Sequence, residues 1–267
     1  MKIAVQMYTL RDFTKTEADL KDTLAKIGKI GYRALQMSAI GAIEGDSPFV
    51  SYATFKRMLD DHQIKCVSAH LGFDTLVNQT DAAIAILNSV DCNYVAIGGA
   101  PGEYSRDGVE GYRRFLDHAA PMIATLGSQG IRFGYHHHAH EFARFSESLR
   151  TLMDVLIDES PVEMHIEVDT YWAIHAGYDP VKLLGRLSTR CANLHVKDKE
   201  IDASTGQPVF APIGEGNLNW KTILPAAKSA AVEAMCVEQD TCRRDPFDCL
   251  RSSYEFLNSQ SRGRFET

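Results

Sequence analysis

The sequence predicts a single (β/α)8 barrel, a TIM barrel, that spans residues 1–267. Three observations lead to this prediction. Short strand-like apolar runs alternate with longer helical patterns along the whole chain, the alternation repeats eight times, and no change in composition marks a domain boundary. A doubly wound open sheet is the alternative, but it normally carries a glycine-rich phosphate loop after its first strand, and the segment MYTLRD (7–12) has no glycine.

Each predicted strand is a short run of residues typical of β structure, and each is followed by a segment with apolar side chains three and four residues apart. The strands cover residues 3–8, 32–38, 65–70, 94–99, 131–138, 163–169, 192–198 and 234–240. The first helix begins near Glu17, after Thr16 as its N-cap. The second helix begins near Tyr52, and the third and fourth cover 81–89 and 108–128. The fifth begins at Ser146 with Leu149 on its apolar face, and the sixth covers 179–187. The seventh begins at Trp220, and the eighth runs from about Pro246 to Leu257.

Composition and charge exclude several classes of protein. The net charge of −7 argues against binding to nucleic acid, which depends largely on neutralising phosphates. No window of about 18 uncharged apolar residues predicts a membrane span, and the N-terminal apolar run is too short for a signal peptide. Six cysteines are scattered without a CxxC pair, which favours a reduced, cytoplasmic protein. A homo-oligomer stays open, since no segment marks a subunit interface.

Polar side chains stand at the ends of the fifth to eighth predicted strands. In a (β/α)8 barrel the active site forms at the carboxyl ends of the strands. The fifth strand ends within the segment GYHHHAHEF (134–142), which places His136 at its end, and the next three strands end near Asp169, His195 and Glu238. Imidazole and carboxylate ligands together suit one divalent metal ion, such as Mn, Co, Zn, Fe or Mg.

Each of these residues also has a plainer interpretation. A lone histidine at a strand end is more often a hydrogen-bonded structural residue than a ligand, and Asp169 before Thr170 is often only a helix cap. The pair Lys197 and Asp198 suggests a surface ion pair of little energetic weight. A metal site is favoured because four successive strands end in residues that bind metals.

Several motifs occur in order along the chain, namely MYTLRD, EVDTYW followed by GYDPVKLL, LHVKD, IGEGNLNW and VEQD. Together they resemble the sugar isomerase/epimerase family with a xylose isomerase-like barrel. The resemblance implies a divalent metal ion held by residues at the ends of strands five to eight. Asp169, His195 and Glu238 fall on three of these four positions.

The fourth position departs from the family pattern. Members of the D-tagatose 3-epimerase group end strand five in a glutamate ligand, whereas His136 stands at that place here, and Glu141 in the following loop is the alternative ligand. The YHHH string (135–138) is similar to the inosose dehydratases, which eliminate water from a keto-inositol. Trp172 stands where many members carry a substrate-binding histidine, and we interpret it as an aromatic wall for the apolar face of a sugar ring.

The site residues suit removal of a proton from a carbon next to a carbonyl, the first step shared by isomerisation, epimerisation and dehydration of keto-sugars. A metal ion polarises the carbonyl, and Glu238 is the first candidate for the base. The candidates on the opposite face of the substrate, as a second base or a general acid, are Glu141, His138 and His136. Lys197 is expected to stabilise the developing oxyanion.

Other residues are expected to bind the substrate. The candidates are His70 at the end of strand three, Tyr8 at the end of strand one, and Trp172. The loop GEGN (214–217) either closes over a bound ligand or forms a plain turn. No basic cluster marks a phosphate site, which favours an unphosphorylated sugar or cyclitol as the small-molecule substrate.

The first functional hypothesis is a divalent-metal-dependent sugar isomerase or epimerase. The second is a metal-dependent dehydratase, a lyase, that acts on a keto-inositol or keto-sugar. Exchange of the α-hydrogen of the substrate fits both, and only loss of water separates them. An AP endonuclease shares the fold but is disfavoured by the acidic chain. A catalytically silent barrel that binds sugar without metal is the remaining alternative.

Overall fold

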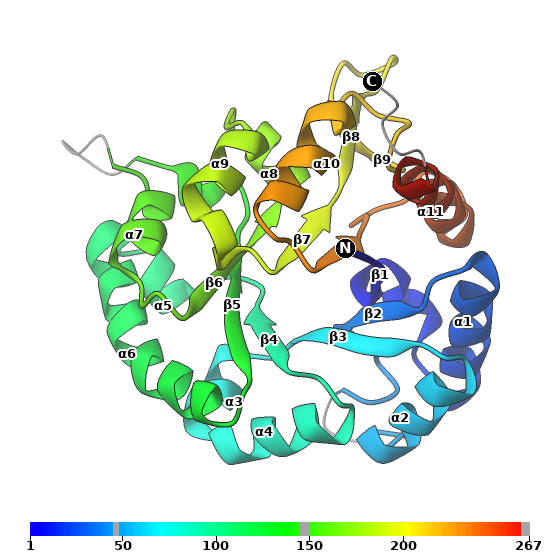
Figure 1. Cartoon of the computed structure of the whole chain (residues 1–267), viewed down its shortest axis with the longest axis horizontal. Helices are drawn as coiled ribbons and strands as arrows, with labels where there is room; N and C mark the ends of the chain where they lie inside the picture. The colour runs from blue at the N-terminus through cyan, green and yellow to red at the C-terminus, as the bar shows by residue number, and fades with distance from the viewer. Residues whose placement is uncertain (45–47, 145–149, 263–267) are drawn as a thin grey trace.

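Eight parallel strands close into a barrel that helices surround (Figure 1). The computed structural model describes residues 1–44, 48–144 and 150–262. Around the barrel the strands follow the order β1-β10-β7-β6-β5-β4-β3-β2, so the last strand pairs with the first. In chain order they are β1 (Lys2–Gln6), β2 (Ala34–Met37), β3 (Lys65–His70), β4 (Tyr94–Ile97), β5 (Arg132–His136), β6 (Met164–Asp169), β7 (Asn193–Val196) and β10 (Ala234–Val237). The predicted (β/α)8 fold is confirmed, while the extent of the domain over residues 1–267 stays a prediction.

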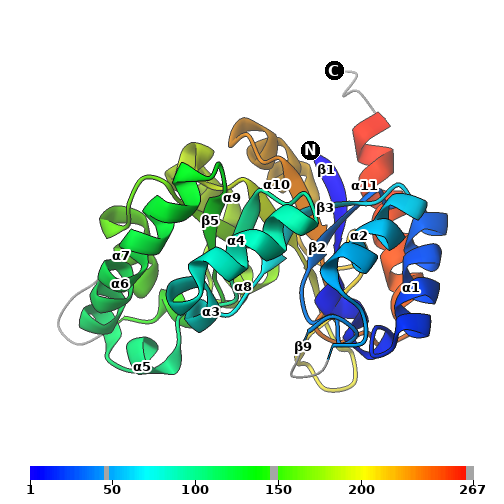
Figure 2. The same cartoon turned by 90° about the horizontal axis from the view of Figure 1, so that it is seen from below.

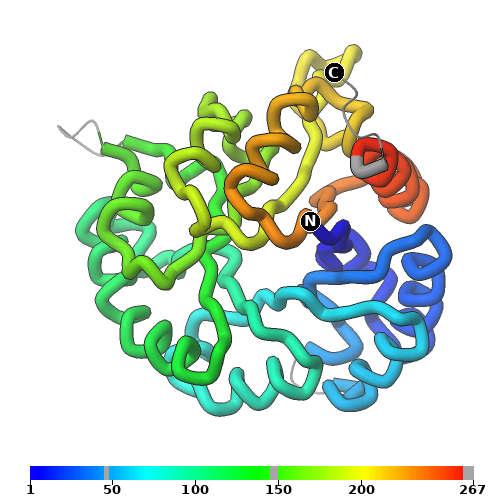
Figure 3. The backbone as a smooth tube through the Cα atoms, in the orientation of Figure 1, coloured from blue at the N-terminus to red at the C-terminus, as the bar shows by residue number. Residues whose placement is uncertain are grey.

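The longer helices form an outer ring. They are α1 (Glu17–Ile30), α2 (Tyr52–Asp61), α4 (Thr80–Ser89), α6 (Gly108–Ser128), α7 (Leu152–Glu159), α9 (Pro180–Leu187), α10 (Trp220–Ser229) and α11 (Pro246–Arg262). Figure 3 shows α11 beside α1, so the last helix completes the ring next to the first. The connections contain shorter helices, η1 (Met7–Phe13), α3 (Phe73–Asn78), α5 (Gly102–Ser105), η2 (His140–Phe142), α8 (Thr170–His175) and η3 (Ser188–Arg190). Within the described part of the chain, no helix combines the length and the apolar character that crossing a bilayer requires.

Capping boxes define where two of the helices begin. At α1 the Thr16 hydroxyl accepts a hydrogen bond from Asp19 N (3.1 Å), and the Asp19 carboxylate accepts one from Thr16 N (3.1 Å), as the sequence predicts for this N-cap. The helix α7 begins in the same way after Thr151. Its predicted start at Ser146, with Leu149 on the apolar face, lies outside the described residues.

Alternation along each strand separates an apolar layer from a polar barrel interior. In β6, Met164, Ile166 and Val168 belong to the large apolar core that the helices cover. Glu167 and Asp169 lie on the other face of the same strand and are fully buried. The barrel interior therefore holds charged side chains in place of the branched apolar layers that usually fill it.

The carboxyl ends of the eight strands meet at one end of the barrel, because all of the strands are parallel. Figure 2 shows the start of β1 at one end of the barrel and an additional hairpin at the opposite end. This hairpin pairs β8 (Asp198–Ile201) with β9 (Pro208–Ala211) in antiparallel fashion and lengthens the connection after β7. It lies at the end where the predicted site residues stand.

Candidate functional site

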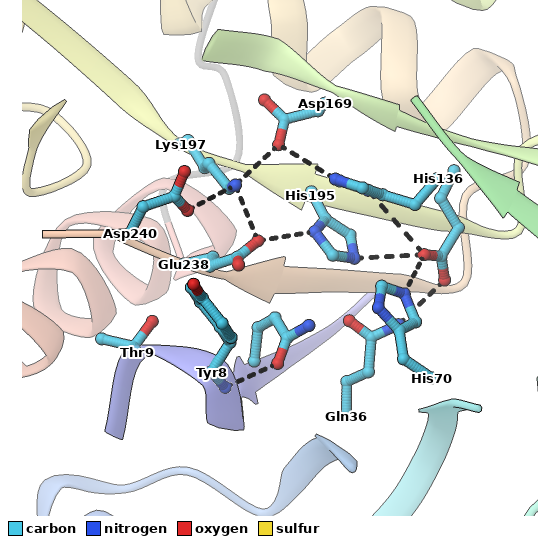
Figure 4. Close-up of polar contacts among 12 residues, drawn as sticks. Tyr8, Thr9, Gln36, His70, His136, Asp169, His195, Lys197, Glu238 and Asp240 are labelled. Atoms are coloured by element: carbon cyan, nitrogen blue, oxygen red, sulfur yellow. Dashed lines mark hydrogen bonds and ion pairs between the residues drawn. The ribbon is translucent and has the colours of Figure 1, made fainter. Parts of the chain in front are cut away.

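Four strand ends bring the predicted metal ligands together. His136 ends β5, Asp169 ends β6, His195 lies in β7, and Glu238 follows β10 directly. All four side chains are buried, and Figure 4 shows His136 facing Asp169 and Glu238 facing His195 within one cluster. His136 Nε2 lies 3.9 Å from Asp169 Oδ2, and His195 Nδ1 lies 2.8 Å from Glu238 Oε2.

Three of these residues have the geometry of a metal centre. One ligand atom from each of His136, Asp169 and His195 lies within 4.8 Å of the others. Asp169 Oδ2 faces His136 Nε2 at 3.9 Å and forms an ion pair with Lys197 Nζ at 3.2 Å, while His136 Nδ1 is buried without a hydrogen bond from any described residue. Two imidazoles and one carboxylate fit a divalent ion, which accepts both ligand types. Glu238 stands beside this group, since its Oε2 lies 2.8 Å from His195 Nδ1.

Lys197 is a fully enclosed ammonium among three carboxylates. Its Nζ lies 3.2 Å from Asp169 Oδ2, 3.0 Å from Glu238 Oε2 and 2.8 Å from Asp240 Oδ1. Burial alone would lower the pKa of Lys197, but the three carboxylates together raise it above its ordinary value. The interpretation of Lys197 and Asp198 as a surface ion pair is therefore wrong, because Lys197 points into the barrel and pairs with other residues.

The charges of the neighbouring groups follow from the same network. Burial would lower the pKa of His195, but Glu167 and Glu238 raise it to about 10. Burial would raise the pKa of Glu238, but Lys197 and His195 hold it well below its usual range. Burial raises the pKa of Asp169 to about 6, against the opposing effect of Lys197. A metal ion that binds here must therefore displace the proton of His195, since ligands bind metals in their deprotonated form.

Glu167 is a central residue to which the sequence assigns no role. Its carboxylate accepts hydrogen bonds from Gln36 Nε2 (2.9 Å) and faces His70 Nε2 at 2.7 Å and His195 Nε2 at 3.2 Å. Burial would raise the pKa of Glu167, but the two imidazoles lower it to about 2, so the group is a carboxylate. Its position two residues before Asp169, on the same strand face, is the sequence signal that points to it. His70, Glu167 and His195 also form a second group with metal-binding geometry.

A pocket of about 470 Å³ opens over this cluster. Seven of the predicted site residues line it, namely Tyr8, His70, His136, His138, His195, Lys197 and Glu238. Glu44 and Asp240 also line the pocket and are not predicted from the sequence, because each follows a strand in a connecting segment whose direction no pattern fixes. Burial raises the pKa of both carboxyl groups.

Glu141 lies outside this pocket. Its buried carboxylate accepts hydrogen bonds from the Tyr135 hydroxyl (2.7 Å) and from His138 N (2.8 Å), and it lies 3.0 Å from His140 Nε2. It thus joins the loop after β5 to the strand. One ligand atom of Glu141 also lies within 4.8 Å of ligand atoms of His138 and His140. The strand-five residue that the structure brings to Asp169 and His195 is His136.

Trp172 stands beside the pocket, in α8. Its backbone N donates a hydrogen bond to Asp169 Oδ1 (2.9 Å), so one carboxylate both caps α8 and faces His136. The indole lines a neighbouring recess together with His138, which is shared by the pocket and the recess.

The loop 214–217 is attached to the barrel by one buried carboxylate. Asp198 accepts hydrogen bonds from the backbone N of Gly214 (2.9 Å), Gly216 (3.3 Å) and Leu218 (3.1 Å), and from Trp220 Nε1 (2.6 Å). A Cβ on Gly216 would lie 2.3 Å from Asp198 Oδ1, so glycine is required for this approach. These contacts favour the plain turn over a loop that closes on a ligand.

The molecule is thus a closed (β/α)8 barrel with a candidate metal centre at the carboxyl ends of its strands. A family model described as xylose isomerase-like TIM barrel matches residues 24–260, and the chain belongs to this family. The resemblance read from the sequence motifs is confirmed.

Comparisons with individual proteins agree with this assignment. The chain is 36% identical over 159 residues to an inosose dehydratase from Geobacillus kaustophilus (strain HTA426), a match that covers 54% of this chain and 50% of the relative. The chain spans about half the length of the curated relatives it matches. A sugar phosphate isomerase/epimerase from Parabacteroides distasonis ATCC 8503 has a similar structure, with a TM-score of 0.77, 20% identity and coverage of 97% of this chain and 93% of the other. The IOLI protein with a bound zinc atom has a TM-score of 0.65 at 12% identity, with both chains fully covered.

Proposed function

We propose that this protein is a divalent-metal-dependent isomerase or epimerase that moves a proton next to the carbonyl of a keto-sugar. The observation that carries the proposal is the buried group of His136, Asp169 and His195 beside the ion-paired Lys197 and Glu238, under one pocket. The three residues of the buried group would hold the metal ion, with Glu238 adjoining. When bound, the ion supplies Lewis-acid polarisation of the substrate carbonyl.

Two residues are placed to handle the proton. Glu238 is ionised at neutral pH, because Lys197 and His195 hold its pKa low, and it lines the pocket from the end of β10. His138 lines the same pocket from beyond β5, and burial lowers its pKa to about 4, so its imidazole is neutral at pH 7. The strands β7 and β6 separate β10 from β5 in the barrel. The two groups therefore approach a substrate from different sides, which an epimerase requires.

Lys197 stabilises negative charge that develops on the substrate. Its ammonium is buried, and its position is fixed by contacts to Asp169, Glu238 and Asp240. A fixed cation in a site that excludes water stabilises an oxyanion more strongly than a mobile one in solvent.

The charges that line the pocket favour a neutral substrate. Lys197 is the one lysine or arginine among its described lining residues, and three carboxylates already neutralise it. Glu44, Glu238 and Asp240 add negative charge to the lining. No further lysine or arginine among these residues is available to pair with a phosphate group, so we propose an unphosphorylated sugar or cyclitol.

A dehydratase acting on a keto-inositol or keto-sugar is the second candidate. The 36% identity to an inosose dehydratase favours it, as does the YHHH string. In this case Glu238 removes the proton, and His138, once protonated, donates a proton to the departing hydroxyl.

Elemental analysis of the protein reconstituted with Mn, Co or Zn tests the metal site. We expect about one ion per chain in the wild type and loss of the ion in Asp169→Asn and His136→Ala. Asparagine caps a helix as well as aspartate does, so loss in Asp169→Asn reports on the ligand and not on α8. Glu141→Gln is the matched control and should keep the ion. A wild type that binds no ion overturns the proposal and leaves the silent sugar-binding barrel.

Proton exchange tests the reaction. The loaded protein is incubated in D2O with a panel of keto-hexoses and a keto-inositol, and NMR follows deuterium at the carbon next to the carbonyl. Exchange with a new sugar isomer supports the isomerase or epimerase, and exchange with loss of water supports the dehydratase. Absence of exchange with every compound, together with incision of an abasic DNA duplex, would instead support the AP endonuclease alternative.

A further inference from the structure

A recess of about 510 Å³ adjoins the polar pocket. The two cavities share Gly98 and His138 in their linings, so they are continuous at this edge. The polar pocket alone, at about 470 Å³, already has the size of a complete small-molecule site, and its lining includes His138, Lys197 and Glu238, the residues proposed to act on the substrate. The recess therefore provides space beyond what the reacting sugar needs.

The lining of the recess is made of rings and backbone. His138 lies between two other rings, with centroids 5.5 Å from the Trp172 indole and 5.9 Å from the nearly parallel His140 imidazole. A Cβ on Gly98 or Gly99 would meet no atom within 4 Å, so the space above these glycines is open. No carboxylate, ammonium or guanidinium group occurs among the described lining residues. The recess thus offers flat ring surfaces, and the pKa of one of its rings, His140, is raised by the adjacent Glu141 carboxylate.

The indole of Trp172 is held in place relative to the polar pocket. Its backbone N is bound to Asp169, and its ring contacts Tyr171 and Phe210 edge to face, with centroids at 5.0 and 6.1 Å. A preorganised aromatic face binds a flat ring at a low entropic cost, because little order is gained on binding.

We propose that the recess binds a second ring attached to the reacting sugar, so that the substrate is a glycoside whose sugar ring carries a ketone at a carbon other than the anomeric one, and not a free monosaccharide. This inference rests on the proposed function, because it places the reacting sugar in the polar pocket. The second ring is an aromatic group or another sugar, both of which present the apolar face that Trp172 and the imidazoles accept.

Titration calorimetry with matched ligands tests the proposal. The probes are the methyl and the phenyl glycosides of glucose, galactose and mannose, which lack the ketone and therefore bind without reacting, with cellobiose as the probe for a second sugar ring. In each pair that binds, the phenyl glycoside should bind about tenfold more tightly than the methyl glycoside, the gain expected from one well-packed ring. A gain shared by cellobiose identifies a second sugar, and a gain confined to the phenyl compound identifies an aromatic group.

Four variants test whether the gain in affinity arises in the recess. Ala139→Trp fills the recess and should remove the difference within a pair, whereas Val162→Trp, which adds the same side chain at an exposed site, should preserve it. Trp172→Leu should lose the gain and Trp172→Phe should retain most of it. Equal affinity within every pair, or a gain that persists in Ala139→Trp, overturns the inference and leaves the proposed function intact. If none of the glycosides binds, this inference is overturned, whereas the proposed function is decided by the exchange experiment with the keto-sugars.

Discussion

Glu167 Oε2 lies 2.7 Å from His70 Nε2 inside the barrel, in a position that solvent does not reach. The same oxygen lies 3.2 Å from His195 Nε2, so one carboxylate orients two imidazoles beneath the pocket. A carboxylate behind a ligand histidine fixes the direction of the ring and adds negative charge near the metal ion. Removal of the Glu167 carboxylate should therefore lower the affinity for the metal ion.

We expect Glu167→Gln to lower metal affinity about tenfold to a hundredfold, the usual effect of removing such a partner. Glutamine keeps the shape and one acceptor oxygen but lacks the charge. Competition with a chromophoric chelator measures the affinity. Glu44→Gln, which removes another carboxylate of the pocket lining, is the control and should change the affinity much less. Equal affinity in Glu167→Gln and wild type would show that Glu167 serves packing alone.

Removal of the buried ammonium should destabilise the metal-free protein. Lys197→Met leaves Asp169, Glu238 and Asp240 close together without their cation. Breaking a buried ion pair from one side costs about 3–5 kcal/mol in the free energy of unfolding. Urea denaturation should show this loss, and added Mn or Zn should recover part of it by supplying positive charge. Lys228→Met, on the exposed face of α10, should change stability by less than about 1 kcal/mol. A small loss in Lys197→Met, or one that metal does not affect, would contradict this account.

The barrel is predictable from the sequence because strand and helix periodicities alternate without interruption, whereas the hairpin after β7 is not. The predicted strand 192–198 divides at Lys197, where the chain leaves the barrel and β8 begins. The position of β9 depends on tertiary packing, since Phe210 stacks on Tyr171 with centroids 4.2 Å apart. No local pattern in the sequence predicts the contact between Phe210 and Tyr171.

The candidate site is likewise predictable from the sequence only in part. Alternation along a strand predicts the meeting of His136, Asp169 and His195, because the direction of a strand residue is fixed by its neighbours. Loop residues have no such constraint. Glu141 is held away from the pocket by the Tyr135 hydroxyl, a contact that depends on how the loop folds back. The fold of the connections, and not their composition, decides which of their side chains reach the site.

Asp198 should matter for stability and not for metal binding. It is fully buried and accepts four hydrogen bonds from the segment 214–220. Asp198→Ala leaves these donors without a partner, and we expect the free energy of unfolding to fall by about 3 kcal/mol or more. Asp198→Asn retains one acceptor oxygen and should lose less. Glu215→Ala, in the same loop but paired with the exposed Arg244, should cost less than about 1 kcal/mol. Loss of the metal ion in Asp198→Ala with unchanged stability would show that Asp198 serves metal binding and not the stability of the fold.

A half-buried imidazole at the other end of the barrel should make stability depend on pH. Burial lowers the pKa of His165 from 6.5 to about 4, and the cations Arg132 and Arg190 add to this shift against the smaller opposing effects of Glu233 and Glu167. His165 Nδ1 is also buried without a hydrogen bond from any described residue. The folded protein therefore holds this ring neutral, whereas the unfolded chain protonates it near its ordinary pKa.

The sign of the effect follows from where the proton binds. Between pH 6.5 and pH 4 the unfolded chain carries more protons on this residue, so stability falls as pH falls through this range and falls no further below it. The difference corresponds to at most about 3 kcal/mol, and to less because solvent screens the partly exposed ring. Urea denaturation of wild type and His165→Leu at steps between pH 7 and pH 4 measures it. Wild type should lose more stability than His165→Leu as pH falls through this range, because leucine does not titrate and the other buried histidines contribute equally to both. Parallel profiles would show that His165 has a similar pKa in the folded and unfolded states.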